Sequence, residues 1–123
     1  MRKSAWIIIV NRDGNVLLTR RSKKVNNSGL YNFAGGKVDN NEKGKAAAIR
    51  EGFEEVEIKI DKAHVKKIAT LTPRGSKMSF YLYRDAGYPV VHHNEEVDSF
   101  VWVQPQRLNA YPLHRPTYLF VSK

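Results

Sequence analysis

A helix-forming segment that carries half of the chain's acidic residues constrains the fold more than any other feature. The chain holds 21 Lys and Arg against 12 Asp and Glu, yet six of those acids fall between positions 39 and 57. Glu51, Glu54 and Glu55 stand at positions i, i+3 and i+4, which share one face of a helix. Like charges at this spacing destabilise an isolated helix by about 0.2–0.5 kcal/mol per pair. The pattern therefore favours a cation such as Mg²⁺, which binds through a few carboxylates together with substrate phosphates.

The residues around this segment predict an α/β (α+β) fold in one domain over residues 1–123. Alanines and an apolar stripe predict the helix over 45–56, with Asn40 or Asn41 as its N-cap. Alternating or β-branched runs predict strands on both sides of the helix, over 5–10, 15–20, 30–34, 65–71, 78–84 and 100–103. Two short helical elements are predicted near the end, a turn over 105–108 and a last helix over 117–121 with Pro116 at its start.

The first two predicted strands are separated only by Asn-Arg-Asp-Gly at positions 11–14. Asn, Asp and Gly favour tight turns between paired strands. The sequence therefore predicts that these two strands form a β-hairpin.

Composition narrows the class of protein and of partner. The chain is 41% hydrophobic, enough for a packed core, and its apolar runs are far shorter than the roughly 20 residues that cross a bilayer, so no membrane partner is predicted. The absence of cysteine excludes disulfides, thiolate metal sites and Cys nucleophiles, and fits a cytoplasmic protein. The net charge of +9 favours anionic partners, which include phosphates, nucleotides and nucleic acids.

The acidic segment resembles the signature box of the Nudix hydrolases, the MutT-like pyrophosphohydrolases. Gly36 is followed at the family spacing by Glu42, the pair Arg50-Glu51 and the pair Glu54-Glu55. The preceding residues 30–37 resemble the lead-in of the box, and the similarity covers most of the chain. The resemblance implies a mixed β-sheet sandwiched between α-helices. It also implies hydrolysis of a nucleoside diphosphate linked to another moiety, with Mg²⁺ or Mn²⁺ as cofactor.

Three positions depart from the family box. Gly52 stands where the family has an apolar residue, and glycine inside a helix costs about 1 kcal/mol relative to alanine. Glu57 replaces a glycine suited to a left-handed helix exit, so the end of the helix is expected to differ from the family norm. Ala34 stands where many members have proline. None of these changes removes a carboxylate.

The resemblance assigns roles within and around the box. It implies that Glu51, Glu54 and Glu55 are catalytic metal ligands and that the carbonyl of Gly36 completes the metal shell. It also places Arg50 among the catalytic residues, as a charge partner of these carboxylates. Glu42 and Gly35 are expected to support the geometry of the site.

Other candidates lie outside the acidic helix. Arg21 and Lys37 are candidate phosphate contacts, with an ordinary surface position as the alternative. Asn32 and Phe33, together with Trp6, are candidates for the nucleotide pocket, although aromatic residues in strands more often fill a core. A later polar loop offers one further metal ligand or base, and the sequence does not distinguish Glu95 from Glu96 in that role.

The substrate stays open at this stage. A small nucleotide is favoured: a nucleoside triphosphate, a dinucleoside polyphosphate or a nucleotide sugar. The positive charge supports a second alternative, a pyrophosphohydrolase of RNA 5′ ends. A third alternative is a non-catalytic Nudix-like sensor that binds nucleotides, suggested by Gly52 and Glu57. The sequence leaves both a monomer and a homodimer open.

Overall fold

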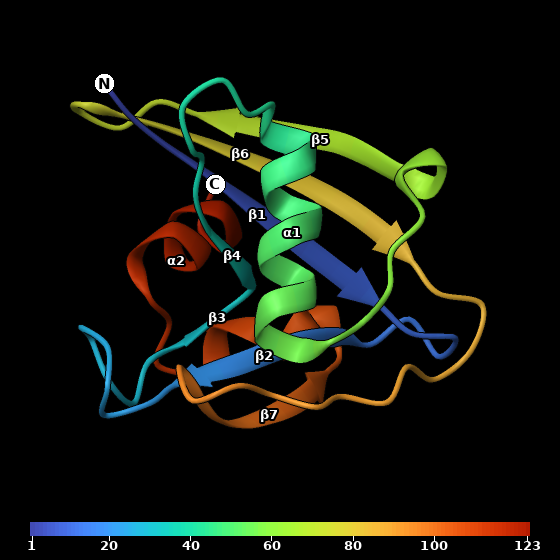
Figure 1. Ribbon diagram of the computed structural model, residues 1–123. Coiled ribbons are helices and arrows are strands. Elements are labelled where there is room, and N and C mark those ends of the chain that lie inside the picture. The colour runs from blue at the N-terminus through green and yellow to red at the C-terminus, as the bar shows by residue number, and fades with distance from the viewer.

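The computed structural model describes residues 1–123 and shows a mixed β-sheet with α-helices on both faces (Figure 1). The elements in chain order are β1 (Arg2–Val10), β2 (Val16–Arg21), β3 (Tyr31–Asn32), β4 (Ala34–Lys37), α1 (Gly44–Val56), the 3₁₀ turn η1 (Lys62–His64), β5 (Val65–Leu71), β6 (Ser76–Arg84), β7 (Val97–Val103), the 3₁₀ turn η2 (Pro105–Ala110) and α2 (Arg115–Val121). No helix is long and apolar enough to cross a membrane.

Strand β1 is the centre of the sheet because both of its edges are paired over the same residues. On one side it pairs antiparallel with β4, and on the other side it pairs parallel with β6. Strand β5 extends the sheet beyond β6, while β3 and β7 pair with the two edges of β2. The predicted mixed sheet with flanking helices is confirmed.

The predicted hairpin between the first two strands is wrong over most of its length. Strands β1 and β2 pair only where Val10 meets Val16, and they diverge from that point (Figure 1). The turn itself forms, because Asn11 Oδ1 accepts hydrogen bonds from the backbone N–H groups of Asp13 and Asn15, both 3.0 Å long. Strands from later in the chain pair with the edges of β1 and β2 instead. A turn motif between two strands does not predict this long-range pairing.

Alternation along β1 divides the core into two layers. Ile7 and Ile9 pack with Ala47 and Ala48 of α1 on one face. Trp6 and the neighbouring even-numbered residues pack on the other face with Phe33, Phe80 and residues of α2. Side chains of a strand point alternately to the two faces of its sheet, so this single strand supplies both cores.

The two ends of α1 differ from the sequence-based expectations. Lys43 is the N-cap and makes no side-chain capping bond, so the prediction of Asn40 or Asn41 as the cap is wrong. The loop is closed instead by Glu42, whose Oε1 accepts the N–H of Asp39 at 3.0 Å. At the other end Glu57 has φ 56°, and its N–H donates to the Phe53 carbonyl at 2.9 Å. The left-handed helix exit is thus retained without a glycine.

Several strand boundaries also differ. The strand predicted over 30–34 is divided into β3 and β4 at Phe33, whose N–H donates to Thr117 Oγ1 at 3.0 Å instead of to a neighbouring strand. β1, β6 and β7 start earlier than predicted. Their additional residues are mostly polar, with Val97 as the exception, and they are held by pairing with distant strands, which local hydrophobicity does not reveal.

Gly52 faces the core between α1 and the sheet. A Cβ atom at this position would lie 3.2 Å from Ile7 Cγ2 and 3.6 Å from Ile60 Cδ1. The first distance requires a shift of only a few tenths of an ångström, whereas a larger side chain has no space there.

We therefore expect Gly52→Leu to lower the free energy of unfolding by about 1–3 kcal/mol, the usual cost of overpacking a core. Gly52→Ala is the matched control, because the gain of about 1 kcal/mol in helix propensity offsets its tight contact. Urea unfolding of the two variants checks the difference. Equal stability of the Leu and Ala variants would contradict this prediction and show that the residues around Gly52 move aside at little cost.

Candidate active site

Two glycines on β4 allow the acids of α1 to reach across the edge of the sheet. Gly36 lies directly under Glu51, and a Cβ at this glycine would stand 2.9 Å from the Glu51 carboxyl carbon. A Cβ at Gly35 would stand 2.6 Å from Trp6 Cε3. A side chain at Gly36 would therefore displace the Glu51 carboxyl, and one at Gly35 would collide with the backbone of β1 and the ring of Trp6.

Glu51 and Glu55 form a hydrogen-bonded carboxyl pair beneath α1. Glu55 is only 7% exposed, and its Oε1 accepts the N–H of Gly35 at 3.4 Å. Burial raises the pKa of Glu55 well above its ordinary value, and the hydrogen bond and negative charge of Glu51 raise it further. Burial also raises the pKa of Glu51. Two carboxylates so close together disfavour each other's charged form.

Arg50 joins the helix to the loop that precedes it. Its guanidinium donates to Glu42 Oε2 at 2.9 Å, to Glu51 Oε2 at 3.0 Å and to the Lys37 carbonyl at 3.1 Å. The hydrogen bond from Arg50 is the main reason that the pKa of Glu42 is lowered. These contacts fix the carboxylate of Glu51, whereas no recorded contact brings the guanidinium to Glu55.

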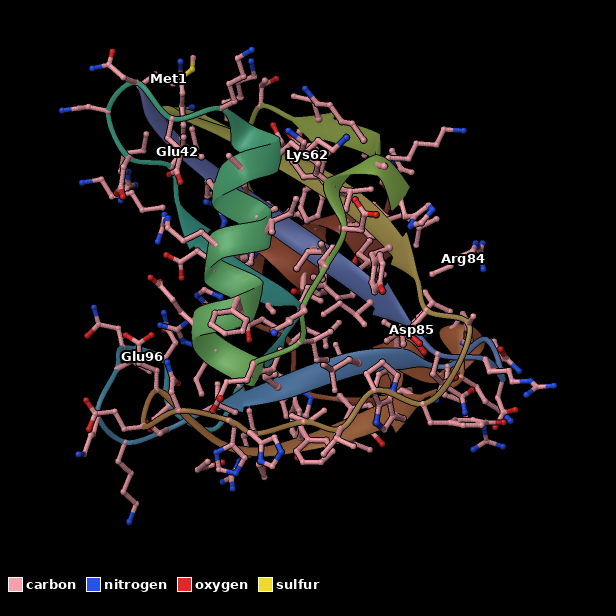
Figure 2. The ribbon with its side chains drawn as sticks, turned by 45° about the vertical axis from the view of Figure 1, so that its right-hand side comes forward. Met1, Glu42, Lys62, Arg84, Asp85 and Glu96 are labelled. Carbon is pink, nitrogen blue, oxygen red and sulfur yellow. The ribbon has the colours of Figure 1, made fainter.

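The carboxyl pair opens onto a cleft of about 1240 Å³. Its lining includes acids from α1 and from the loop before β7, cations from the ends of β2 and β4, apolar or aromatic groups from the sheet, and the residue before α2. Among these lining residues are Glu51, Glu55 and Glu96, then Arg21 and Lys37, then Trp6 and Met78, and finally His114. Figure 2 shows Glu42 beside the N-terminal end of α1 and Glu96 beside its C-terminal end.

The structure distinguishes the two acids of the later loop. Glu96 lines the cleft, and its charge contributes to the raised pKa of Glu55, after burial and the effects of Glu51. The side chain of Glu95 is 74% exposed and forms an ion pair of 3.0 Å with Lys24. Of the two alternatives that the sequence left open, the structure therefore places Glu96 at the cleft and Glu95 away from it.

Two other predicted site residues lie outside the cleft. Phe33 is fully buried, with its ring centroid 6.4 Å from that of Phe80 and 5.7 Å from that of Phe120, so it belongs to the core and not to a nucleotide pocket. The side chain of Glu54 is 52% exposed and pairs with Arg50 at 3.1 Å, outside the cleft lining. Asn32 does line the cleft, where its Oδ1 accepts the hydroxyl of Thr19 at 3.0 Å.

Sequence reasoning missed His114. Its ring lies edge-on to Trp6 with centroids 6.2 Å apart, and its Nδ1 atom is buried without a hydrogen-bond partner. Burial, and to a lesser extent the charge of Arg21, lower the pKa of His114 to about 4. The ring is therefore neutral near pH 7. This residue precedes α2, far from the acidic box, and no local pattern marks it.

A comparison with known proteins identifies the arrangement. The sequence model of the NUDIX domain matches residues 1–121. The chain belongs to the Nudix family. It is a Nudix hydrolase that acts on phosphoanhydrides, as the resemblance implied.

Individual relatives agree with this assignment. The chain is 29% identical over 105 residues to the CTP pyrophosphohydrolase of Escherichia coli K12, which covers 85% of this chain and 78% of that protein. The MutT NUDIX hydrolase of Burkholderia pseudomallei superposes with a TM-score of 0.80 at 25% identity, over 98% of this chain and 95% of the other. DR0079 of Deinococcus radiodurans has a TM-score of 0.85 at 22% identity, over 98% and 81% of the two chains, and shares the fold.

The donor set of this Nudix site suits a hard divalent cation, although no three acidic or histidine side chains are already clustered as a complete ligand set. Glu51, Glu55 and Glu96 offer only oxygen atoms, which Mg²⁺ and Mn²⁺ prefer. A divalent cation would supply the positive charge that Glu55 lacks, since Arg50 bonds Glu51 and Glu42 and not Glu55. The residues therefore fit the cofactor of the family.

The buried pair makes a prediction about the stability of the metal-free Nudix domain. Because the pKa of Glu55 in the folded protein lies above its ordinary value of 4.5, the unfolded chain releases its proton first as the pH rises. The free energy of unfolding should therefore fall as the pH rises from about 4.5 toward the raised pKa. Glu55→Gln should flatten this dependence, which melting temperatures in EDTA between pH 5 and 8 will measure. Glu54→Gln is the control and should keep the wild-type slope.

Proposed function

We propose that this chain is a Mg²⁺- or Mn²⁺-dependent pyrophosphohydrolase of nucleoside triphosphates. The observation that carries the proposal is a single cleft that holds the half-buried Glu51 and the buried Glu55 together with Arg21, Lys37 and aromatic residues. The cleft thus contains acids that suit a metal ion, cations that suit phosphate groups and aromatic rings that suit a nucleobase. The name of the Escherichia coli relative makes CTP the first substrate to test.

The carboxylates of Glu51, Glu55 and Glu96 would hold the divalent ion, with the carbonyl of Gly36 as a further oxygen donor. When bound, the ion neutralises the charge that builds on the phosphoanhydride oxygens and makes water a usable nucleophile near neutral pH. In the reaction a water oxygen bonds to phosphorus, the bond from that phosphorus to the bridging oxygen breaks, and a cleft carboxylate accepts the proton of the water.

The cations of the cleft suit the polyphosphate. Neither Arg21 nor Lys37 forms an ion pair with a carboxylate. Arg21 is oriented by a hydrogen bond of 2.7 Å from its Nε to the Asn26 carbonyl. Because each cation keeps its charge available at the cleft, both can bind phosphate oxygens.

The aromatic end of the cleft suits a nucleobase. Trp6 and Met78, both largely buried, contribute apolar atoms to the cleft lining, and the neutral ring of His114 adds one hydrogen-bond donor and one acceptor. Base recognition commonly combines stacking surface with a few polar groups of this kind.

Substitution of the cleft acids tests the proposed reaction. Glu55→Gln and Glu96→Gln should lower kcat for CTP by about 10²–10⁴-fold, the scale of a positioned acid or base. Glu95→Gln is the matched control in the same loop and should retain the wild-type kcat within about twofold, because its carboxylate points into solvent. Mass spectrometry of the products with Mg²⁺ and with Mn²⁺ checks both results.

The same assay distinguishes the alternative substrates. Turnover of 5′-triphosphate RNA in preference to CTP would replace the proposal with the RNA alternative. The absence of turnover of any nucleotide, together with tight binding of one, would favour the sensor. Equal activities of the Glu95→Gln and Glu96→Gln variants would contradict the assignment of Glu96 to the site.

The low pKa of His114 makes a separate prediction about substrate binding. Because the ring is neutral well above its pKa of about 4, KM for CTP should show no inflection near pH 6.5. His114→Ala should raise KM about 10-fold while kcat changes less, because a lost hydrogen bond and a lost aromatic contact together are worth about 1–2 kcal/mol. His93→Ala, at an exposed position, is the control. A KM that rises as His114 protonates between pH 7 and 6 would contradict the neutral ring.

A further inference from the structure

Glu96 is held in the cleft by a segment that has no regular structure of its own. Residues 85–96 connect β6 to β7 without a helix or strand, and Glu96 is the last of them. In Figure 2 this connection passes below the C-terminal end of α1. For the Glu96 carboxylate to act together with Glu51 and Glu55, other parts of the fold must fix the backbone of this loop.

Ser22 fixes this segment from the end of β2. Its hydroxyl donates to the Glu95 carbonyl at 2.7 Å, and its backbone N–H donates to the Glu96 carbonyl at 2.9 Å. The same hydroxyl accepts the N–H of Lys24 at 3.2 Å. Ser22 is 7% exposed and holds two successive carbonyls of the loop, that of Glu95 through its hydroxyl and that of Glu96 through its backbone N–H.

Asn94 fixes the segment from the opposite side. Its backbone N–H donates to the carbonyl of Glu55 at 3.0 Å. Its side-chain Oδ1 accepts the N–H of Glu96 at 3.0 Å. One residue thus connects the backbone of the buried glutamate on α1 to the backbone of the loop glutamate.

We propose that Ser22 and Asn94 are positioning residues that hold the carboxylate of Glu96 against the pair of Glu51 and Glu55, an inference that rests on the proposed function. Both polar groups of the Glu96 backbone are bonded, its N–H to Asn94 and its carbonyl to Ser22. Only the side chain of Glu96 is left free to turn; this residue is exposed and lines the cleft. Neither Ser22 nor the side chain of Asn94 lines the cleft, so both act through Glu96.

The first test is the kinetics of Ser22→Ala and Asn94→Ala with CTP and Mn²⁺. Each should lower kcat about 10- to 100-fold, the usual effect of removing an outer hydrogen bond behind a metal site, while KM changes less than threefold. Asn94→Asp keeps the acceptor oxygen and should recover most of the activity. Ser99→Ala removes a hydroxyl that bonds only the neighbouring Asp98 at 3.1 Å, and this control should match the wild type.

A double-mutant cycle separates positioning from a general structural role. In a Glu96→Gln background, Ser22→Ala should lower kcat by less than about twofold, because the carboxylate that it positions has already been removed. An undiminished loss in that background would overturn the proposal, as would wild-type kcat in both alanine variants. If Ser22→Ala does not fold, the comparison of Asn94→Ala with Asn94→Asp carries the test.

Two readouts do not depend on turnover. Hydrogen exchange of the Glu96 amide should accelerate at least about tenfold in Asn94→Ala, because its acceptor is lost. The dissociation constant of Mn²⁺, measured by electron paramagnetic resonance, should rise about 10-fold in both alanine variants. If the wild type does not hydrolyse CTP, the proposed function fails while these two readouts still judge the positioning. Unchanged exchange and unchanged Mn²⁺ affinity would overturn the positioning itself.

Discussion

The close approach of α1 to the bare backbone of β4 is the constraint on which the site depends. Gly36 leaves room for the Glu51 carboxyl, and Gly35 supplies the N–H that bonds Glu55. The helix lies on one face of the sheet, and the cleft is lined both by acids of this helix and by residues of the sheet. Because no side chain stands between them at this edge, two carboxyls on successive turns reach the cleft.

This geometry places negative charge where water is largely excluded. Glu55 is nearly buried, and its carboxyl has another carboxyl, from Glu51, as its hydrogen-bond partner. Such a pair is costly without a counter-charge, and the neighbouring Arg50 serves Glu51 and Glu42. The strain of the metal-free pair and its suitability for a divalent cation therefore have the same physical origin. The loop before β7 adds Glu96 to the same cleft, and hydrogen bonds to Ser22 and Asn94 hold the backbone of this residue.

Much of the fold was predictable from local patterns. The helix predicted over 45–56 and the strand predicted over 65–71 match α1 and β5 to within one residue. Both predictions rest on the pattern of residue types within a short stretch of the chain, which does not depend on distant contacts. The hairpin prediction failed, since a tight turn does not determine which strands occupy the far edges of β1 and β2. The expected change at the helix exit also failed, because Glu57 adopts the left-handed conformation that glycine favours.

The sequence by itself determined the class of chemistry. Gly36, Arg50 and the glutamates of the acidic helix stand at fixed spacings in the sequence. Helical periodicity alone predicts that the glutamates share one face, and the complete pattern identifies the family. The tertiary structure alone decided which groups share the cleft: Glu96 instead of Glu95, His114 instead of Phe33. These residues meet across elements that are distant in the chain, and only the packing of the sheet against its helices sets which side of each strand or loop faces the cleft.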